Sequence, residues 1–375
     1  MGGSPGRDTA LFGFLLISLV AVTGVGLSGF TEGENTGLGR GINQAGMLDY
    51  ENGWWPEEGT NYLDGQNEWT VANINFNLGK MVTEFNFDHV RFHTDPTRFN
   101  TNAAYRANLN TLCGLADAFG LDVIVDFYGD WQAYGIANIP ALWTLAANTL
   151  KLNANVVFEL WNEPDLDYGS GYYNTEQATW QTLLQDCIDA IRATGATQKI
   201  IACYKSTIWA NVTPHPARGA GSTVQALYDY PLVDPESNLY YQLHIYRENA
   251  IINQPEAYYA YTEAQWEDWF ELCLINDAIA DGYKFWFTEV GANSWHVGDD
   301  LARELSFFEA ALHLLTTKVQ PHTIWVWTVT AHMMHGIFTN DVWLPPPNGA
   351  GTLVQVPLAS HIASLTNLMS MMRRR

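Results

Sequence analysis

The stretch that says most about the fold of this chain runs from residue 156 to residue 164 and reads Val156-Val157-Phe158-Glu159-Leu160-Trp161-Asn162-Glu163-Pro164. It starts as a short apolar run, which is typical of a parallel strand buried on both faces, and it ends in polar residues before a proline. Similar runs recur along the chain, with amphipathic stretches between them. The eight predicted strands are Gly41–Met47, Phe87–His93, Leu121–Tyr128, Val156–Glu163, Lys199–Ser206, Leu239–Tyr246, Lys284–Gly291 and Thr323–Thr330.

Two of the stretches between strands show helical patterns. Thr175–Thr194 carries apolar residues at helical spacing, and Thr262–Ile279 begins with Thr262-x-x-Gln265, which is typical of a capping box. Eight strand–helix units in about 330 residues predict a single (β/α)8 barrel domain, which we assign to residues 31–375. Such barrels carry their chemistry at the carboxyl ends of the strands, so polar residues at those ends are the candidates for a functional site.

The composition limits the kinds of partner. Of 375 residues, 47% are hydrophobic and 15% are charged, which is typical of a globular protein. The net charge of −22 opposes binding to nucleic acid and to other anions, and it favours a neutral partner. The 15 tryptophans fit a protein that presents flat apolar faces to a ligand.

The N-terminus carries a predicted targeting segment. Residues 10–30 have no charge and are mostly apolar, and at about 1.5 Å per residue they would just span a bilayer core as a helix. Residues 1–30 are therefore either a cleaved signal peptide or a membrane anchor, and both interpretations place the domain outside the cytosol. A G-x-G-x-x-G match at Gly24–Gly29 follows no strand, so we do not interpret it as a dinucleotide site.

The sequence carries no recognisable metal or cofactor motif. The four cysteines, Cys113, Cys187, Cys203 and Cys273, form no C-x-x-C pair, and both disulfides and buried free thiols remain open for them. There is no H-E-x-x-H and no calcium loop, and the predicted barrel domain, from residue 31 onward, contains no G-x-S-x-G elbow. We therefore expect neither a metal ion nor a cofactor.

Two glutamates occupy matching positions at predicted strand ends. Glu163 ends the fourth strand, and Glu289 lies near the end of the seventh. Either one alone could cap a helix or form a surface ion pair. Arg91 and His244 also lie at strand ends, although each could instead be a structural ion-pair partner or a core histidine. Together, at one end of one barrel, these four residues indicate an active site.

The sequence around these residues resembles glycoside hydrolase family 5, and most of all its endo-β-1,4-glucanases. The matching residues are Asn162-Glu163-Pro164, Glu289, Arg91, His244-Ile245-Tyr246, Trp327, the opening Gly41-Ile42-Asn43-x-Ala45-Gly46, and the stretch Ala190–Ala196. The resemblance implies hydrolysis of β-linked glycans with retention of configuration, in which two carboxyl groups lie about 5–5.5 Å apart. It also implies a neutral β-linked polysaccharide or oligosaccharide as the substrate. We further expect a monomer.

The resemblance also implies a role for each site residue. Glu163 would be the acid and base, Glu289 the nucleophile, Arg91 the cation that keeps Glu289 ionised, Asn162 the partner of the sugar 2-hydroxyl, His244 part of the acid–base relay, Tyr246 a contact of the nucleophile, and Trp327 the floor of the subsite where the bond breaks. Two carboxyl groups so close repel each other as anions, so one of them stays protonated near neutral pH.

One departure from the family concerns the third strand. Family members usually carry a histidine at its end, whereas this chain has Tyr128 after Asp126-Phe127. His93, from the neighbouring strand, can fill that space, and we expect both His93 and Tyr128 to contact substrate. The tryptophans expected to stack on sugars are Trp54, Trp55, Trp131, Trp209 and Trp295.

Three alternatives remain open from the sequence. The same site could act on mannan, xylan or a β-glucosylated lipid, because loop shapes and a few hydroxyl contacts set specificity. It could transfer sugars rather than hydrolyse them, since a transglycosidase needs the same residues and differs in excluding water. The chain could also be a carbohydrate-binding barrel without turnover, although the presence of both glutamates argues against this.

Overall fold

A computed structural model describes residues 39–43, 71–83, 87–129, 131–164, 177–204, 223–246, 263–272, 274–291, 308 and 310–324. The chain divides into two units, Met1–Thr36 and Gly37–Arg375, and all described residues belong to the second. The predicted targeting segment therefore lies outside the described residues, as does Gly24–Gly29. Among the helices that the structure describes, none combines the length and the apolar character that crossing a membrane requires.

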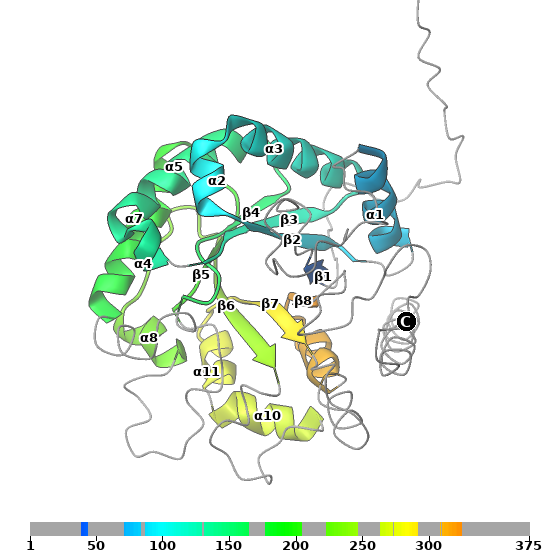
Figure 1. The fold of residues 1–375 in the computed structure, drawn as a ribbon. Coiled ribbons are helices and arrows are strands. Elements are labelled where there is room, and N and C mark those ends of the chain that lie inside the picture. Colours follow the sequence, from blue (N-terminus) through cyan, green and yellow to red (C-terminus); the bar gives the residue numbers. More distant parts are fainter. Residues whose placement is uncertain are drawn as a thin grey trace, which may run out of the picture. The chain divides into compact units, whose positions relative to one another are not determined.

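Eight parallel strands form a closed barrel in which each strand pairs with the next along the chain and β8 pairs with β1 (Figure 1). The strands are β1 (Arg40–Asn43), β2 (His89–Thr94), β3 (Asp122–Phe127), β4 (Val156–Glu159), β5 (Ile200–Ala202), β6 (Leu239–Tyr246), β7 (Phe285–Gly291) and β8 (His322–Ile324). Each predicted strand overlaps one of these, so the predicted (β/α)8 barrel is confirmed.

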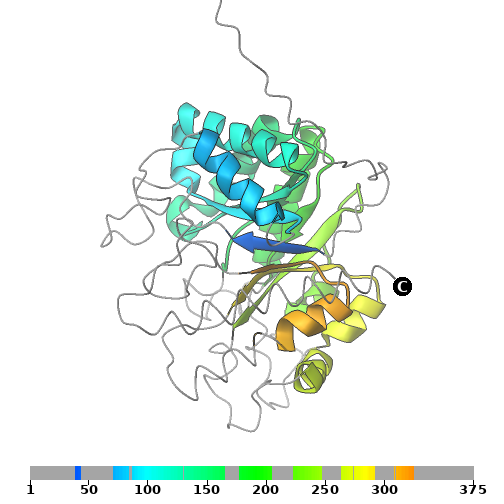
Figure 2. The same cartoon turned by 90° about the vertical axis from the view of Figure 1, so that its right-hand side faces the viewer.

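Helices surround the outside of the barrel (Figure 1), with the helices of its first half on one side of the barrel and α10 and α11 on the opposite side (Figure 2). The helices are α1 (Val71–Thr83), α2 (Pro96–Thr101), α3 (Ala103–Ala118), α4 (Trp131–Tyr134), the 3-10 turn η2 (Ile136–Asn138), α5 (Ile139–Leu150), α7 (Gln177–Ala193), α8 (Thr223–Asp229), α10 (Glu263–Leu272) and α11 (Ile275–Ala280).

One prediction was wrong, because a stretch expected to form a single helix forms two. The stretch Thr262–Ile279 forms two helices, α10 and α11, rather than one. The chain breaks at Leu274, whose φ of 60° lies in the left-handed region and cannot continue a right-handed helix. The predicted capping box at Thr262 lies outside the described residues, whereas the predicted helix Thr175–Thr194 agrees with α7.

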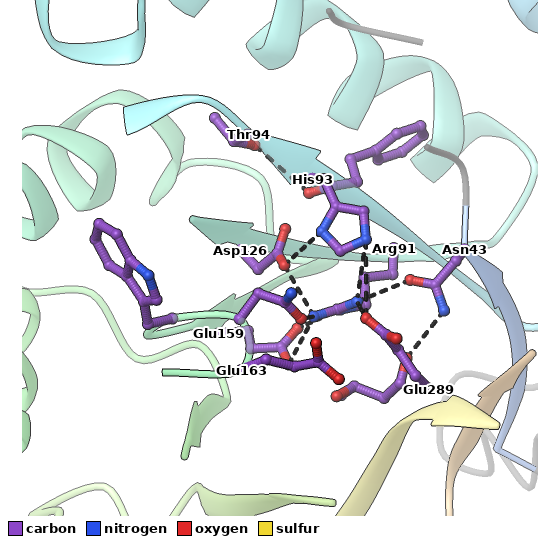
Figure 3. Close-up of polar contacts among 12 residues, drawn as sticks. Asn43, Arg91, His93, Thr94, Asp126, Glu159, Glu163 and Glu289 are labelled. Atoms are coloured by element: carbon purple, nitrogen blue, oxygen red, sulfur yellow. Dashed lines mark hydrogen bonds and ion pairs between the residues drawn. The ribbon is translucent and has the colours of Figure 1, made fainter. Parts of the chain in front are cut away.

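Side chains alternate across the strands, and this alternation decides where the site lies. Along β2, Val90 and Phe92 pack in the main hydrophobic core, whereas Arg91 and His93 point into the barrel toward the other polar residues of the site (Figure 3). The apolar run that predicted this strand therefore also contains polar residues, Arg91 and His93, that face the interior of the barrel.

The interior of the barrel is closed near the amino ends of its strands. A separate apolar cluster fills it there, made of Ile124, Val157, Ile201 and Trp286. His89 packs edge-on against Trp286, with ring centroids 5.0 Å apart. Gly41 has to be glycine, because a Cβ there would lie 2.0 Å from Cδ2 of His89. These contacts support the polar layer above them.

Three cysteines are free thiols in the core, namely Cys113, Cys187 and Cys203. Burial raises the pKa of Cys113 to about 12, which keeps this thiol protonated and unreactive. The interpretation as buried thiols therefore holds for these three, while Cys273 lies outside the described residues.

Candidate active site

Arg91 is the centre of the polar layer. Its side chain is fully buried, and three carboxyl groups surround it (Figure 3). Nη1 donates to Oε1 of Glu289 at 2.8 Å, and Nη2 donates to Oδ2 of Asp126 at 2.8 Å. Nε and Nη2 donate to the two oxygens of Glu159 at 2.5 and 3.1 Å. Burial alone would lower the pKa of Arg91, but Asp126, Glu159 and Glu289 outweigh that effect and raise it, so Arg91 is a permanent cation.

Two amides complete the coordination of the guanidinium. Asn43, at the end of β1, accepts from Nη1 through Oδ1 at 2.9 Å. Asn162 accepts from Nη2 through Oδ1 at 2.8 Å. Five side chains from the ends of four strands, β1, β3, β4 and β7, thus contact one cation, which fixes the positions of the carboxylates relative to one another.

Glu163 sits on a backbone turn directly after β4. Its φ of 38° is unusual for a residue other than glycine, and such conformations persist only where the surroundings hold them. The backbone N–H of Asn162 donates to the carbonyl of Phe127 at 2.7 Å. This bond ties the turn to the end of β3.

Three buried indoles bond to the backbone around this turn. Nε1 of Trp143 donates to the carbonyl of Leu160 at 3.0 Å. Nε1 of Trp131 donates to the carbonyl of Pro164 at 3.0 Å. The third donor, Trp161, reaches the carbonyl of Gly129 at 2.9 Å. The turn that carries Glu163 is therefore anchored on both sides.

His244 connects the two glutamates. Its Nδ1 lies 2.7 Å from Oε1 of Glu163 and 3.6 Å from Oε2 of Glu289. Its Nε2 lies 2.9 Å from the hydroxyl of Thr288. A hydroxyl can donate or accept, so His244 can hold its proton on either nitrogen and contact Glu163 in either protonation state.

A bulge in β7 brings Glu289 level with His244. Leu243 pairs with Phe287, but the next residue, His244, pairs with Glu289, so Thr288 is the extra residue. Because the bulge breaks the alternation of side chains, Thr288 and Glu289 both contact His244. A regular strand would direct one of them out of the barrel.

The two glutamates converge. One oxygen from each, together with a ring nitrogen of His244, lie within 4.8 Å of one another. The side chain of Glu163 is 18% exposed and that of Glu289 is 6% exposed, so a ligand can approach from the side of Glu163. Chemically, the trio can share a proton, and among the described residues it is the group whose donor atoms could hold a metal ion.

His93 lies where its sequence position predicted, beside the nucleophile candidate. Its Nε2 is 3.9 Å from Oε1 of Glu289, and its Nδ1 is 2.8 Å from Oδ2 of Asp126. Nε2 also lies 3.4 Å from Nη1 of Arg91, which can only donate. The neutral ring therefore carries its proton on Nδ1. Tyr128 packs edge-on against it, with centroids 5.6 Å apart.

The carboxyl groups below the site differ in their affinity for protons. Burial would raise the pKa of Asp126, but Arg91 and His93 outweigh burial and lower it. For Glu159, burial dominates over Arg91 and raises the pKa. Sequence reasoning missed Glu159, and it treated Asp126 only as a marker of the third strand. The available signal was spacing, because both lie an even number of residues from other inward-facing positions on their strands.

Trp131, one of the tryptophans expected to stack on sugars, is instead a packing residue of the core. Trp131 is 2% exposed, and its ring lies 5.0 Å from that of Trp180. A buried indole has no face to offer a sugar, so the prediction for Trp131 does not hold. Trp54, Trp55, Trp209, Trp295, Trp327 and the side chain of Tyr246 lie outside the described residues.

A parallel barrel with two carboxyl groups at the ends of β4 and β7 defines a class of enzymes that work at the carboxyl ends of their strands. Residues 43–330 match the family model described as cellulase (glycosyl hydrolase family 5). The chain belongs to glycosyl hydrolase family 5, as its motifs suggested.

A curated relative is endo-β-1,4-glucanase A from Emericella nidulans, which is 26% identical over 217 residues. The match covers 56% of this chain, and the chain spans only 60% of the length of that relative.

Solved structures share the fold at low sequence identity. Cel5A from Thermotoga maritima, solved with mannotriose, has a TM-score of 0.59 at 16% identity and covers 88% of this chain and 98% of its own. An endo-β-1,4-glucanase from Xanthomonas axonopodis pv. citri has a TM-score of 0.57 at 17% identity, with 86% and 98% covered. A hyperthermophilic endocellulase from the archaeon Pyrococcus horikoshii has a TM-score of 0.59 at 16% identity, with 84% and 91% covered.

Proposed function

We propose that this protein is a retaining, endo-acting glycoside hydrolase that cleaves β-1,4-linked glucan chains by double displacement. The observation that carries the proposal is the convergence of Glu163 and Glu289, whose nearest ligand atoms lie within 4.8 Å. Retaining enzymes hold their two carboxyl groups about 5–5.5 Å apart, whereas inverting enzymes leave about 6.5–9.5 Å for a water molecule. The short separation supports the retaining mechanism.

In the first step, Glu289 attacks the anomeric carbon as a carboxylate. The bond from that carbon to the leaving oxygen breaks, and Glu163 gives its proton to that oxygen. Nη1 of Arg91 donates to Oε1 of Glu289 at 2.8 Å, so a cation lies beside the oxygen that carries the negative charge this step requires.

In the second step, the ester between Glu289 and the sugar is hydrolysed. Glu289 has lost its charge in the ester, so Glu163 is no longer opposed as an anion and takes a proton from water. The hydroxide equivalent attacks the anomeric carbon, the ester bond breaks, and Glu289 returns as a carboxylate. His244, 2.7 Å from Glu163, can follow both changes by moving its own proton between its two nitrogens.

The proposed substrate is a neutral glucan. A net charge of −22 disfavours anionic polymers, and the curated relative carries the name of an endo-β-1,4-glucanase. Oδ1 of Asn162 is occupied by Arg91, so its N–H2 group is what it offers to a sugar 2-hydroxyl. The apolar segment at residues 10–30 supports a place of action outside the cytosol, as a secreted or anchored protein.

A second candidate substrate is mannan. The Thermotoga maritima structure of the same fold contains mannotriose, and glucan and mannan differ only in the configuration of the 2-hydroxyl. The family resemblance assigns Asn162 to that hydroxyl, so we expect this residue to distinguish the two substrates.

The deciding experiment follows the anomeric protons of the products by NMR during hydrolysis of cello-oligosaccharides and manno-oligosaccharides. We expect β product first, with new reducing ends from the glucan. An α product first would exclude the retaining mechanism. Chain lengths that redistribute without new reducing ends would indicate a transglycosidase, and binding without either change would indicate a carbohydrate-binding barrel.

A further inference from the structure

Arg91 faces more negative charge than it can neutralise. Asp126, Glu159 and Glu289 all contact this one guanidinium, and Asp126 and Glu159 are fully buried. Water cannot solvate a surplus of charge at this depth, and like charges this close disfavour full ionisation. One of the three carboxyl groups therefore has to hold a proton.

The neighbours of each carboxyl group indicate which one it is. Oδ2 of Asp126 accepts from Arg91 and from Nδ1 of His93, both at 2.8 Å. Glu159 also faces the side-chain amide of Gln242, which can present its N–H or, after rotation, its carbonyl oxygen. The carbonyl oxygen of Gln242 is buried and has no hydrogen-bond partner within the described residues, so in the rotated amide it can accept a hydrogen bond from a protonated Glu159. Burial also raises the pKa of Glu159, whereas Arg91 and His93 keep that of Asp126 low against the effect of burial.

The same carboxyl group fixes the orientation of the guanidinium. Glu159 binds the edge formed by Nε and Nη2, at 2.5 and 3.1 Å. This leaves Nη1 for Oε1 of Glu289 at 2.8 Å. A two-point contact holds a planar group against rotation, which a single hydrogen bond does not.

We propose that Glu159 is a positioning residue for the proposed hydrolysis: a protonated, buried carboxyl group that clamps Arg91 while leaving its positive charge to Asp126 and the nucleophile Glu289. This inference rests on the proposed function. An ionised Glu159 would compete with Glu289 for the charge of Arg91, whereas a neutral one orients Arg91 without that competition. The groups that face Glu159 are Arg91 from β2, Asp126 from β3, Gln242 from β6 and Thr288 from β7.

The first test compares two substitutions of the same kind, Glu159→Gln and Asp126→Asn. Each replaces a carboxyl group by an amide of similar shape, but only Asp126→Asn removes a charge if Glu159 is protonated. We expect Asp126→Asn to move the acid limb of the kcat/KM profile to lower pH and Glu159→Gln to leave it within about 0.3 pH units. We expect Glu159→Gln to lower kcat about tenfold with a smaller change in KM, because its N–H2 group cannot accept from Arg91.

Two outcomes of this comparison would overturn the inference. An acid limb that shifts equally in both variants would mean that Glu159 is ionised. A kcat that stays within about twofold in Glu159→Gln would mean that it does not position Arg91.

The second test needs neither activity nor a variant of Glu159. Infrared spectroscopy at about pH 7 on protein labelled with 13C-glutamate should show the carbonyl stretch of a protonated glutamate. The measurement is made on Glu163→Gln, because Glu163 also carries a proton in the proposed mechanism. Absence of the labelled band there overturns the inference, even if hydrolysis proceeds as proposed. Its presence in Glu163→Gln, combined with a wild-type protein that cleaves no glycan, would overturn the proposed function alone.

Discussion

His244 and Glu163 are joined by a contact of 2.7 Å between Nδ1 and Oε1, and the opposite nitrogen of the same ring lies 2.9 Å from the hydroxyl of Thr288. The histidine is buried, so its orientation is set by these two partners. This arrangement orients the carboxyl group that, in the proposed mechanism, acts first as an acid and then as a base.

Replacement of His244 by Ala should lower kcat/KM about 100-fold, because Glu163 loses its orienting partner. Thr288→Val is the matched control, since it keeps the shape of the side chain and removes the hydroxyl that holds Nε2. We expect a loss of about tenfold there. Equal rates for His244→Ala and the wild type on cello-oligosaccharides would remove His244 from the mechanism.

Substitution of Glu289 and substitution of Glu163 should differ in how the loss of activity depends on the leaving group of the substrate. Glu289→Gln should abolish turnover of every substrate, because no other described group can form the ester. Glu163→Gln should lose about 10³-fold on cello-oligosaccharides but much less on an aryl glycoside whose leaving group needs no proton. The release of the aryl group is measured by its absorbance. The reverse pattern would exchange the two roles.

His93 should act in place of the usual strand-three histidine. His93→Ala should lower kcat/KM about tenfold, since it removes the group 3.9 Å from Glu289 that Asp126 holds in place. Tyr128→Phe keeps the ring that packs on His93, and we expect it to stay within about twofold. If the tyrosine variant loses more than the alanine variant, the hydroxyl of Tyr128 is the functional group instead.

Substitution of Trp143 should lower both the free energy of unfolding and the activity. Trp143→Phe removes the hydrogen bond to the carbonyl of Leu160, beside the turn of Glu163, and should cost about 2 kcal/mol in the free energy of unfolding. Trp286→Phe is the control, because within the described part of the chain its Nε1 has no hydrogen-bond partner. Denaturant unfolding and kcat/KM together should show an activity loss only for Trp143→Phe.

Acid should destabilise the barrel through His322. Burial lowers the pKa of His322 to about 4 against 6.5 for the free side chain. Between these values the unfolded chain binds a proton that the folded chain does not, so stability falls as the pH drops from 6.5 toward 4. The loss should reach about 3 kcal/mol at most. Above pH 6.5, where both states are neutral, His322 contributes no pH dependence.

The measurement compares the wild type with His322→Gln by denaturant unfolding at several pH values. Glutamine can still donate to the carbonyl of Gln320, as Nδ1 of His322 does at 2.9 Å. We expect a flatter dependence in the variant. Parallel curves for the two proteins would show that His322 does not cause the decline.

The barrel and the two glutamates could be predicted from the sequence because both depend on local pattern. Short apolar runs predicted the strands, and acids at the ends of the fourth and seventh runs predicted a pair that the structure brings together. Arg91 was expected beside Glu289, and the structure places Nη1 2.8 Å from its oxygen.

The rest could not be predicted, because it depends on residues that are distant in the sequence. Trp131 is buried by Trp180, which comes 49 positions later on another helix. The break at Leu274 carries no glycine or proline to announce it. The bulge at Thr288 exists only in the pairing of β6 with β7. Glu159 went unnoticed because an acid inside an apolar run has meaning only once the barrel closes around Arg91.

The apolar cluster at the amino ends of the strands limits the path by which a ligand can reach and leave the site. Ile124, Val157, Ile201 and Trp286 are each at most 4% exposed, so no chain can thread through the cylinder. In the proposed function, substrate and product therefore both pass the carboxyl ends of the strands, where Glu163 and Glu289 lie.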